Sequence, residues 1–91
     1  MTKPLAVQRG DADVSHASAA VLGLLAQREA GATICPSEAA RRIAPPGSDW
    51  RAQMAVVHDA VDRLLAEGKV QLSWQGRALP ERAGPYRIAA G

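Results

Sequence analysis

The sequence of 91 residues contains no phenylalanine, one cysteine, one tyrosine and two tryptophans. Without phenylalanine, a hydrophobic core has to be filled by Leu, Val, Ile and Ala, and Trp50 and Trp74 are its only very large candidates. The single cysteine excludes an intramolecular disulfide, and this scarcity fits a reducing compartment. We therefore expect a cytoplasmic protein.

Long apolar runs are missing as well. No stretch approaches the roughly 20 apolar residues that a membrane-spanning helix needs, and the N-terminal apolar run is too short for a signal peptide. We therefore expect no membrane partner. Apolar residues still make up 47% of the chain, which is typical of a globular protein. We expect residues 1–13, which show no apolar periodicity, to be a flexible tail and residues 14–91 to form a single domain.

Catalytic and metal-binding motifs are also lacking. The chain has no HxxxH, CxxC or GxSxG spacing, and its candidate side chains His16, His58, Cys35 and Ser37 are scattered. We expect no enzymatic activity, no cofactor and no metal. For Cys35 we expect a small buried residue beside Ile34. The alternative is an activated thiol at the N-terminus of the following helix, where the helix dipole lowers a thiol pKa.

The strongest positive signal is a helical pattern over residues 48–68. Its large apolar residues recur at spacings of four and three residues, as they do on one stripe of a helix. Ser48 is the expected N-cap and Gly68 the expected C-terminal residue. The stripe, which we expect in the core, consists of Trp50, Met54, Val57, Val61, Leu64 and Leu65.

Shorter patterns surround this helix. Residues 15–29 predict a first helix, capped by Asp13 or Ser15, and residues 32–34 a short strand. Pro36 at a first helical position and Glu38 two residues later predict a second helix over residues 36–43. Alternation over 70–74, a turn at 75–76, and short runs at 77–79 and 86–88 predict hairpin strands. This order favours an α+β winged helix-turn-helix, a three-helix core with a small antiparallel sheet.

Five segments, ICPSEAARR, WRAQM, VDRLLAEGKV, QG and GPYRI, occur in this order between residues 20 and 89. In them the chain resembles an uncharacterised family of short bacterial winged-helix proteins, a domain of unknown function. The resemblance implies the winged-helix fold and no activity.

The charges point to two alternative functions. Residues 49–67 hold two arginines against four carboxylates, a net charge of −2, whereas residues 69–91 hold four basic residues against Glu81, a net charge of +3. One expectation is a binding module for DNA or RNA. Its main contacts would come from the basic residues 69–91, which we call the wing, and the helix over residues 48–68, which we call helix three, would read few bases. Its contacts would be Arg41, Arg42, Arg51, Arg77 and Arg82. The alternative is a module that binds itself or another protein through an exposed face of helix three, formed by Ala52, Ala55 and Val56.

Overall fold

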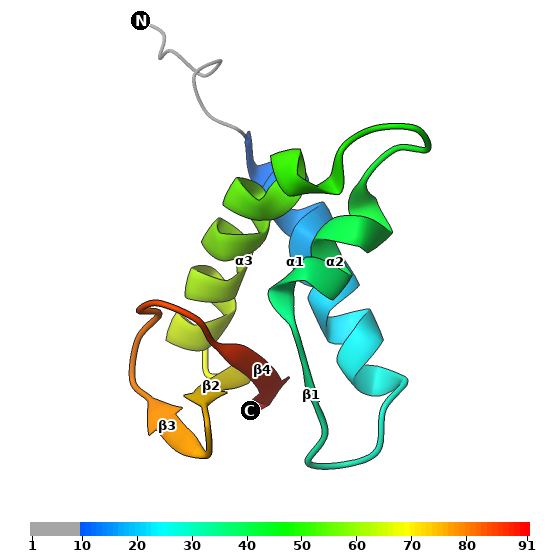
Figure 1. The fold of residues 1–91 in the computed structure, drawn as a ribbon. Coiled ribbons are helices and arrows are strands. Elements are labelled where there is room, and N and C mark those ends of the chain that lie inside the picture. The colour runs from blue at the N-terminus through cyan, green and yellow to red at the C-terminus, as the bar shows by residue number, and fades with distance from the viewer. Residues whose placement is uncertain (1–9) are drawn as a thin grey trace, which may run out of the picture.

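A computed structural model describes residues 10–91 of the protein. It contains three α-helices, a 3-10 helix and four strands (Figure 1). In chain order these are α1 (Gly10–Ala26), β1 (Thr33–Ile34), α2 (Pro36–Ile43), η2 (Trp50–Gln53), α3 (Met54–Ala66), β2 (Val70–Trp74), β3 (Arg77–Leu79) and β4 (Arg87–Ala90). Among residues 10–91, none of the helices is long and apolar enough to cross a bilayer.

The four strands form one antiparallel sheet in the order β1-β4-β2-β3. The central pair aligns Leu72 with Ile88, and the outer pair aligns Leu72 with Leu79. The sheet lies at one end of the helical layer, with the β2–β3 hairpin projecting from it (Figure 1). The expected α+β class is confirmed, and the arrangement is compatible with a winged-helix-like fold.

Helix α2 has the predicted bounds because its signals are local. Cys35 is the N-cap, Pro36 occupies the first helical position, and the backbone N–H of Cys35 donates to Oε2 of Glu38 at 2.9 Å. The Glu38 carboxylate thereby provides an acceptor for the Cys35 N–H, which has no partner within the helix. Ala39 and Ala40 face the core, while Arg41 and Arg42 are exposed, as expected.

Helix α1 begins at Gly10, earlier than the expected caps Asp13 and Ser15. The expected tail therefore divides: residues 1–9 lie outside the described residues, and residues 10–13 are helical. The helix ends at Ala26, earlier than the predicted residue 29, so Arg28 lies in the turn that follows.

The long helix also differs at its start. Asp49, not Ser48, is the N-cap, and it accepts the backbone N–H of Arg51 at 3.0 Å. The hydroxyl of Ser48 instead donates to the carbonyl of Pro45 at 2.6 Å, within the turn after α2. The first turn is the 3-10 helix η2, and the α-helix begins only at Met54. The predicted continuous α-helix from residue 48 is therefore wrong at its first turn.

The core lies between the three helices and one face of the sheet. Val57, Val61 and Leu64 of the predicted stripe are buried there with Leu24, whereas Trp50, Met54 and Leu65 are only half-buried at its edge. Trp74 is 38% exposed and outside the core, contrary to expectation. The core is therefore built from side chains smaller than tryptophan.

Candidate functional site

The most organised cationic group lies where α2, the following turn and η2 meet. The guanidinium carbon of Arg41 on α2 is 4.3 Å from the centroid of the Trp50 ring, and that of Arg51 on η2 is 4.7 Å away. Guanidinium groups stack favourably on aromatic faces. A stacked guanidinium keeps the N–H groups along its edge directed outward, so both can still donate to a ligand. We call these three side chains the Trp50 cluster.

Two further observations describe the charge of the Trp50 cluster. Arg51 also contacts the carboxylate of Asp49 at 3.4 Å, but both side chains are mostly exposed, so water screens this pair. Arg42, the next candidate on α2, directly follows Arg41 in the sequence and is also exposed. Three of the five predicted nucleic-acid contacts, Arg41, Arg42 and Arg51, therefore lie on α2 and η2.

The two predicted contacts in the wing behave differently. Arg82 donates from Nε and Nη2 to the two carboxylate oxygens of Asp62 on α3, at 2.9 and 3.0 Å. The hydrogen bond from Arg82 lowers the pKa of the Asp62 carboxyl, and the carboxylate in turn raises the pKa of Arg82. Arg77 on β3 is exposed. The sequence predicted a freely available basic wing, but one of its two arginines is paired with the helix beside it.

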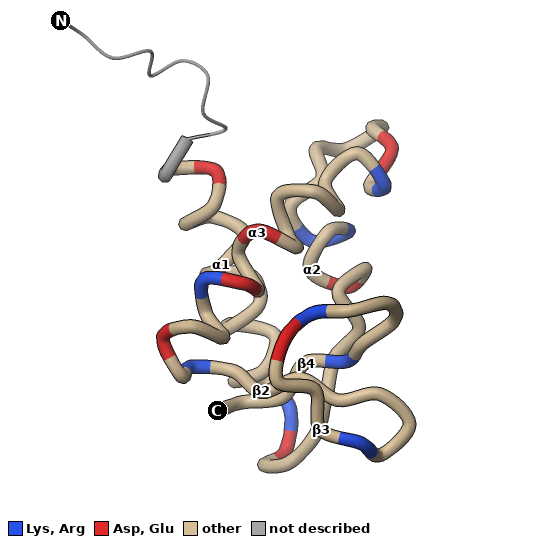
Figure 2. The backbone as a smooth tube through the Cα atoms, turned by 90° about the vertical axis from the view of Figure 1, so that its left-hand side faces the viewer, with Lys and Arg blue, Asp and Glu red and all other residues tan. Residues whose placement is uncertain are grey.

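The other basic residues of the C-terminal part also have partners. Lys69 lies 3.4 Å from the carboxylate of Glu67. Arg87 donates from Nε to the hydroxyl of Thr33 at 2.7 Å and from Nη2 to the Thr33 carbonyl at 3.2 Å. Figure 2 shows basic segments beside α2, β4 and β3, interspersed with acidic ones. The predicted net charge of +3 is therefore spread over the surface and partly neutralised.

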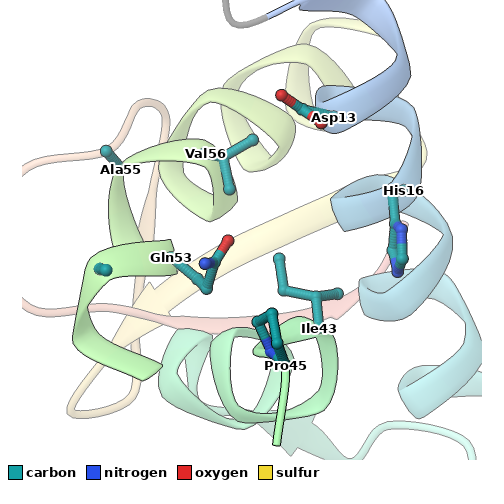
Figure 3. A pocket seen from close by; sticks show the side chains of 8 residues that line it. Asp13, His16, Ile43, Pro45, Gln53, Ala55 and Val56 are labelled. Carbon is teal, nitrogen blue, oxygen red and sulfur yellow. The ribbon is translucent and has the colours of Figure 1, made fainter. Parts of the chain in front are cut away.

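The alternative face on helix three forms part of a groove. Ala52, Ala55 and Val56 line a cavity of about 420 Å³ with Asp13 and His16 of α1. Figure 3 shows Val56 and Gln53 directed toward Ile43 and Pro45, the residues that line the opposite side. Ala52 and Ala55 are exposed, but Val56 is buried, so its predicted exposure is wrong. The face predicted from the sequence is therefore part of a groove, with the exposed Ala52 and Ala55 at its rim.

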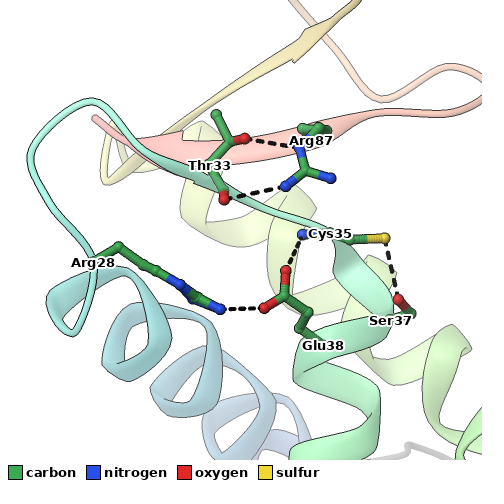
Figure 4. A network of polar contacts seen from close by, with 6 residues as sticks. All are labelled: Arg28, Thr33, Cys35, Ser37, Glu38 and Arg87. Carbon is green, nitrogen blue, oxygen red and sulfur yellow. Dashed lines mark hydrogen bonds and ion pairs between the residues drawn. The ribbon is translucent and has the colours of Figure 1, made fainter.

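Cys35 takes part in a polar network around the start of α2 (Figure 4). Glu38 bridges the backbone N–H of Cys35 and the guanidinium of Arg28, and the Ser37 hydroxyl donates to the Cys35 sulfur at 3.1 Å. Cys35 is only half-buried, less than expected. Its position as the N-cap is the one that the alternative interpretation required.

Sequence reasoning missed a contact between α3 and the start of β4. Nδ1 of His58 lies 2.7 Å from the hydroxyl of Tyr86, which is buried. The two residues are 28 positions apart, so no local pattern indicates the pair. Within residues 10–91, no three His, Cys, Asp or Glu side chains gather in a way that could hold a metal ion.

The protein is an α+β protein compatible with a winged-helix-like fold, and it carries a cationic cluster where α2, the following turn and η2 meet. The chain belongs to a protein family of unknown function, DUF3253, whose sequence pattern matches residues 15–91. The expected membership of a domain-of-unknown-function family is confirmed. Comparison with curated proteins gives no match.

Proposed function

We propose that this protein is a non-enzymatic nucleic-acid-binding module that contacts the phosphate backbone of DNA. The observation that carries the proposal is the Trp50 cluster, in which Arg41 and Arg51 stack near one indole ring. An arginine that already stacks on the ring loses less side-chain freedom when it binds a ligand. Its N–H groups can still donate hydrogen bonds to phosphate oxygens. The single cysteine supports a cytoplasmic location, and the resemblance to short bacterial winged-helix proteins supports a bacterial origin.

We expect the Trp50 cluster, and not the wing, to make the main contacts with DNA. Arg82 already donates two hydrogen bonds to Asp62, so a phosphate has to displace a carboxylate to reach it. The guanidinium of Arg41 has no comparable carboxylate partner among residues 10–91. Residues 49–67 carry a net charge of −2, and this negative balance disfavours deep entry of α3 into the major groove. Binding is therefore electrostatic, weak and nearly independent of sequence.

The test compares two double variants that remove the same charge. Arg41→Gln with Arg51→Gln alters the Trp50 cluster, and Arg77→Gln with Arg82→Gln alters the wing. Fluorescence anisotropy with a labelled duplex of random sequence measures both, from about 20 mM salt upward, where screening is weakest. We expect the double variant in the Trp50 cluster to weaken DNA binding more than the double variant in the wing does. It should also reduce the slope of log affinity against log salt concentration by nearly 2, because each lost phosphate contact lowers this slope by about 0.9.

Three outcomes contradict the proposal in different ways. A larger effect of the wing pair would make the wing the principal contact. Equal affinities for the parent and both variants would show that these arginines do not bind DNA. The absence of binding even at about 20 mM salt would remove the nucleic-acid function and favour the second candidate.

The second candidate is a protein-interaction or self-association module. The observation that favours it is that Ala52, Ala55 and Val56 share one groove of about 420 Å³ with His16. Small side chains at the rim let another helix approach closely. Ala55→Glu places a charge at that rim, and we expect it to abolish any dimer that the parent forms in sedimentation. Ala66→Glu, an exposed alanine of the same helix outside the groove, is the matched control.

A further inference from the structure

The tip of the β2–β3 hairpin presents an aromatic side chain to solvent. Trp74 is 38% exposed, and it is the one large apolar side chain that the described part of the chain exposes to this degree. The register explains why the core does not cover it. β4 pairs with β2 only as far as Ser73, which lies opposite Arg87, so Trp74 has only β3 beside it.

Trp74 directly precedes a tight hairpin turn. Trp74 pairs with Arg77 across the two-residue turn Gln75-Gly76. Both turn residues have positive φ, 51° and 82°, which is the geometry of a type I′ hairpin. Directly opposite residues of an antiparallel pair hold their Cβ atoms about 5 Å apart, on the same face. The side chains of Trp74 and Arg77 therefore extend from the same face of the hairpin tip.

The hairpin itself carries no negative charge. Arg77 is the only charged residue between positions 70 and 79. An exposed aromatic ring beside a cation, on a segment without acidic residues, matches the combination that binds single-stranded nucleic acid. The ring stacks on a base, and the cation contacts the adjoining phosphate.

We infer that the hairpin tip binds an unpaired base of single-stranded nucleic acid, with Trp74 stacked on the base and Arg77 on its phosphate. The inference rests on the proposed nucleic-acid-binding function and adds a preference for unpaired bases. Inside a duplex each base face is covered by its neighbours, so a lone indole at a hairpin tip reaches only an unpaired or terminal base. The site is separate from the Trp50 cluster, because η2 directly precedes α3 and the start of α3 lies at the far end of that helix from the β2–β3 hairpin (Figure 1).

The experiment compares labelled 12-nucleotide oligothymidine and oligouridine with a 12-base-pair duplex by fluorescence anisotropy. Trp74→Leu keeps an apolar side chain but removes the ring, and Trp74→Phe keeps a ring. We expect Trp74→Leu to weaken single-strand binding about 5- to 100-fold, the range that stacking on one base supplies. Trp74→Phe should keep most of the single-strand affinity of the parent. In both Trp74 variants the affinity for the duplex should change less than about twofold. Gln71→Ala, an exposed position of the same strand, is the control.

A second measurement locates the contact. The chain has two indole N–H signals in NMR spectra, and Trp74→Phe identifies which belongs to Trp74. We expect oligothymidine to shift the Trp74 signal more than the Trp50 signal. The difference between the oligothymidine and oligouridine arms shows which nucleic acid is preferred.

The inference is overturned if Trp74→Leu binds single strands as tightly as the parent, or if the Trp74 signal does not move. Duplex binding that still depends on Arg41 and Arg51 would then leave the proposed function standing. If the parent binds neither single strands nor duplex, the inference and the proposed function both fail. Single-strand binding through Trp74 without duplex binding would support the inference and contradict the role of the Trp50 cluster.

Discussion

The hydroxyl of Tyr86 lies 2.7 Å from Nδ1 of His58, and the two rings are tilted by 53° with centroids 5.7 Å apart. This contact joins the middle of α3 to the residue that precedes β4. Burial lowers the pKa of His58, and the nearby guanidinium of Arg82 lowers it further, while Asp62 and Asp59 oppose the shift. Burial also raises the pKa of Tyr86, so its hydroxyl stays protonated and available as a hydrogen-bond partner.

The lowered pKa of His58 predicts a stability that depends on pH. Between the folded pKa and the unfolded value of about 6.5, the unfolded chain binds more protons than the folded one. Stability is therefore greatest above about pH 6.5 and falls as the pH drops toward the folded pKa. We expect urea unfolding of the parent to lose more free energy between pH 7.5 and 5 than that of His58→Gln. Parallel curves for the two proteins would contradict this assignment.

Helix α2 could be predicted residue by residue because its determinants are adjacent in sequence. Cys35, Pro36 and Glu38 specify its start, and the prolines that follow it prevent continuation. The hairpin turn at Gln75-Gly76 was equally local. Such signals depend only on backbone geometry within a few residues, so tertiary packing did not override them.

Val56 and Trp74 were predicted wrongly for two different reasons. A continuous α-helix over residues 48–68, as predicted, would turn by about 100° per residue. The 3-10 helix η2 turns by about 120° per residue, and this shifts the phase of α3 relative to Trp50. Val56 consequently faces the core. Alternation in β2 gave the correct face for Trp74, but no pattern in that strand shows how far β4 extends beside it. The pairs His58–Tyr86 and Arg82–Asp62 likewise depend on the tertiary fold.

Leu64 and Arg63, neighbours on α3, test the core assignment. Leu64 is 2% exposed within the core, whereas Arg63 is exposed. We expect Leu64→Ala to lower the free energy of unfolding by about 2–5 kcal/mol, because it removes buried methyl groups and leaves a cavity. Arg63→Ala should cost less than about 1 kcal/mol, as exposed charged residues usually do. Urea melts of both variants measure this, and equal losses would show that α3 packs through a different face.

The ion pair between Arg82 and Asp62 predicts how the wing would respond if nucleic acid is bound. Both side chains are partly exposed, at 34% and 48%, so Asp62→Asn should change stability by less than about 1 kcal/mol. It removes one negative charge from α3 and frees the guanidinium of Arg82 for phosphate. We expect duplex DNA affinity to rise at low salt and the gain to shrink as salt increases.

Two further variants separate the two causes of that gain. Arg82→Gln should have little effect on duplex affinity in the parent, where Asp62 holds the guanidinium, and should remove most of the gain in the Asp62→Asn background. Asp59→Asn removes a charge from the same helix but keeps Asp62 as the hydrogen-bond acceptor of Arg82. An equal gain from Asp59→Asn would assign the whole effect to charge on α3. A large loss on Arg82→Gln in the parent would show that phosphate displaces Asp62, and the wing would then rank beside the Trp50 cluster as a DNA contact.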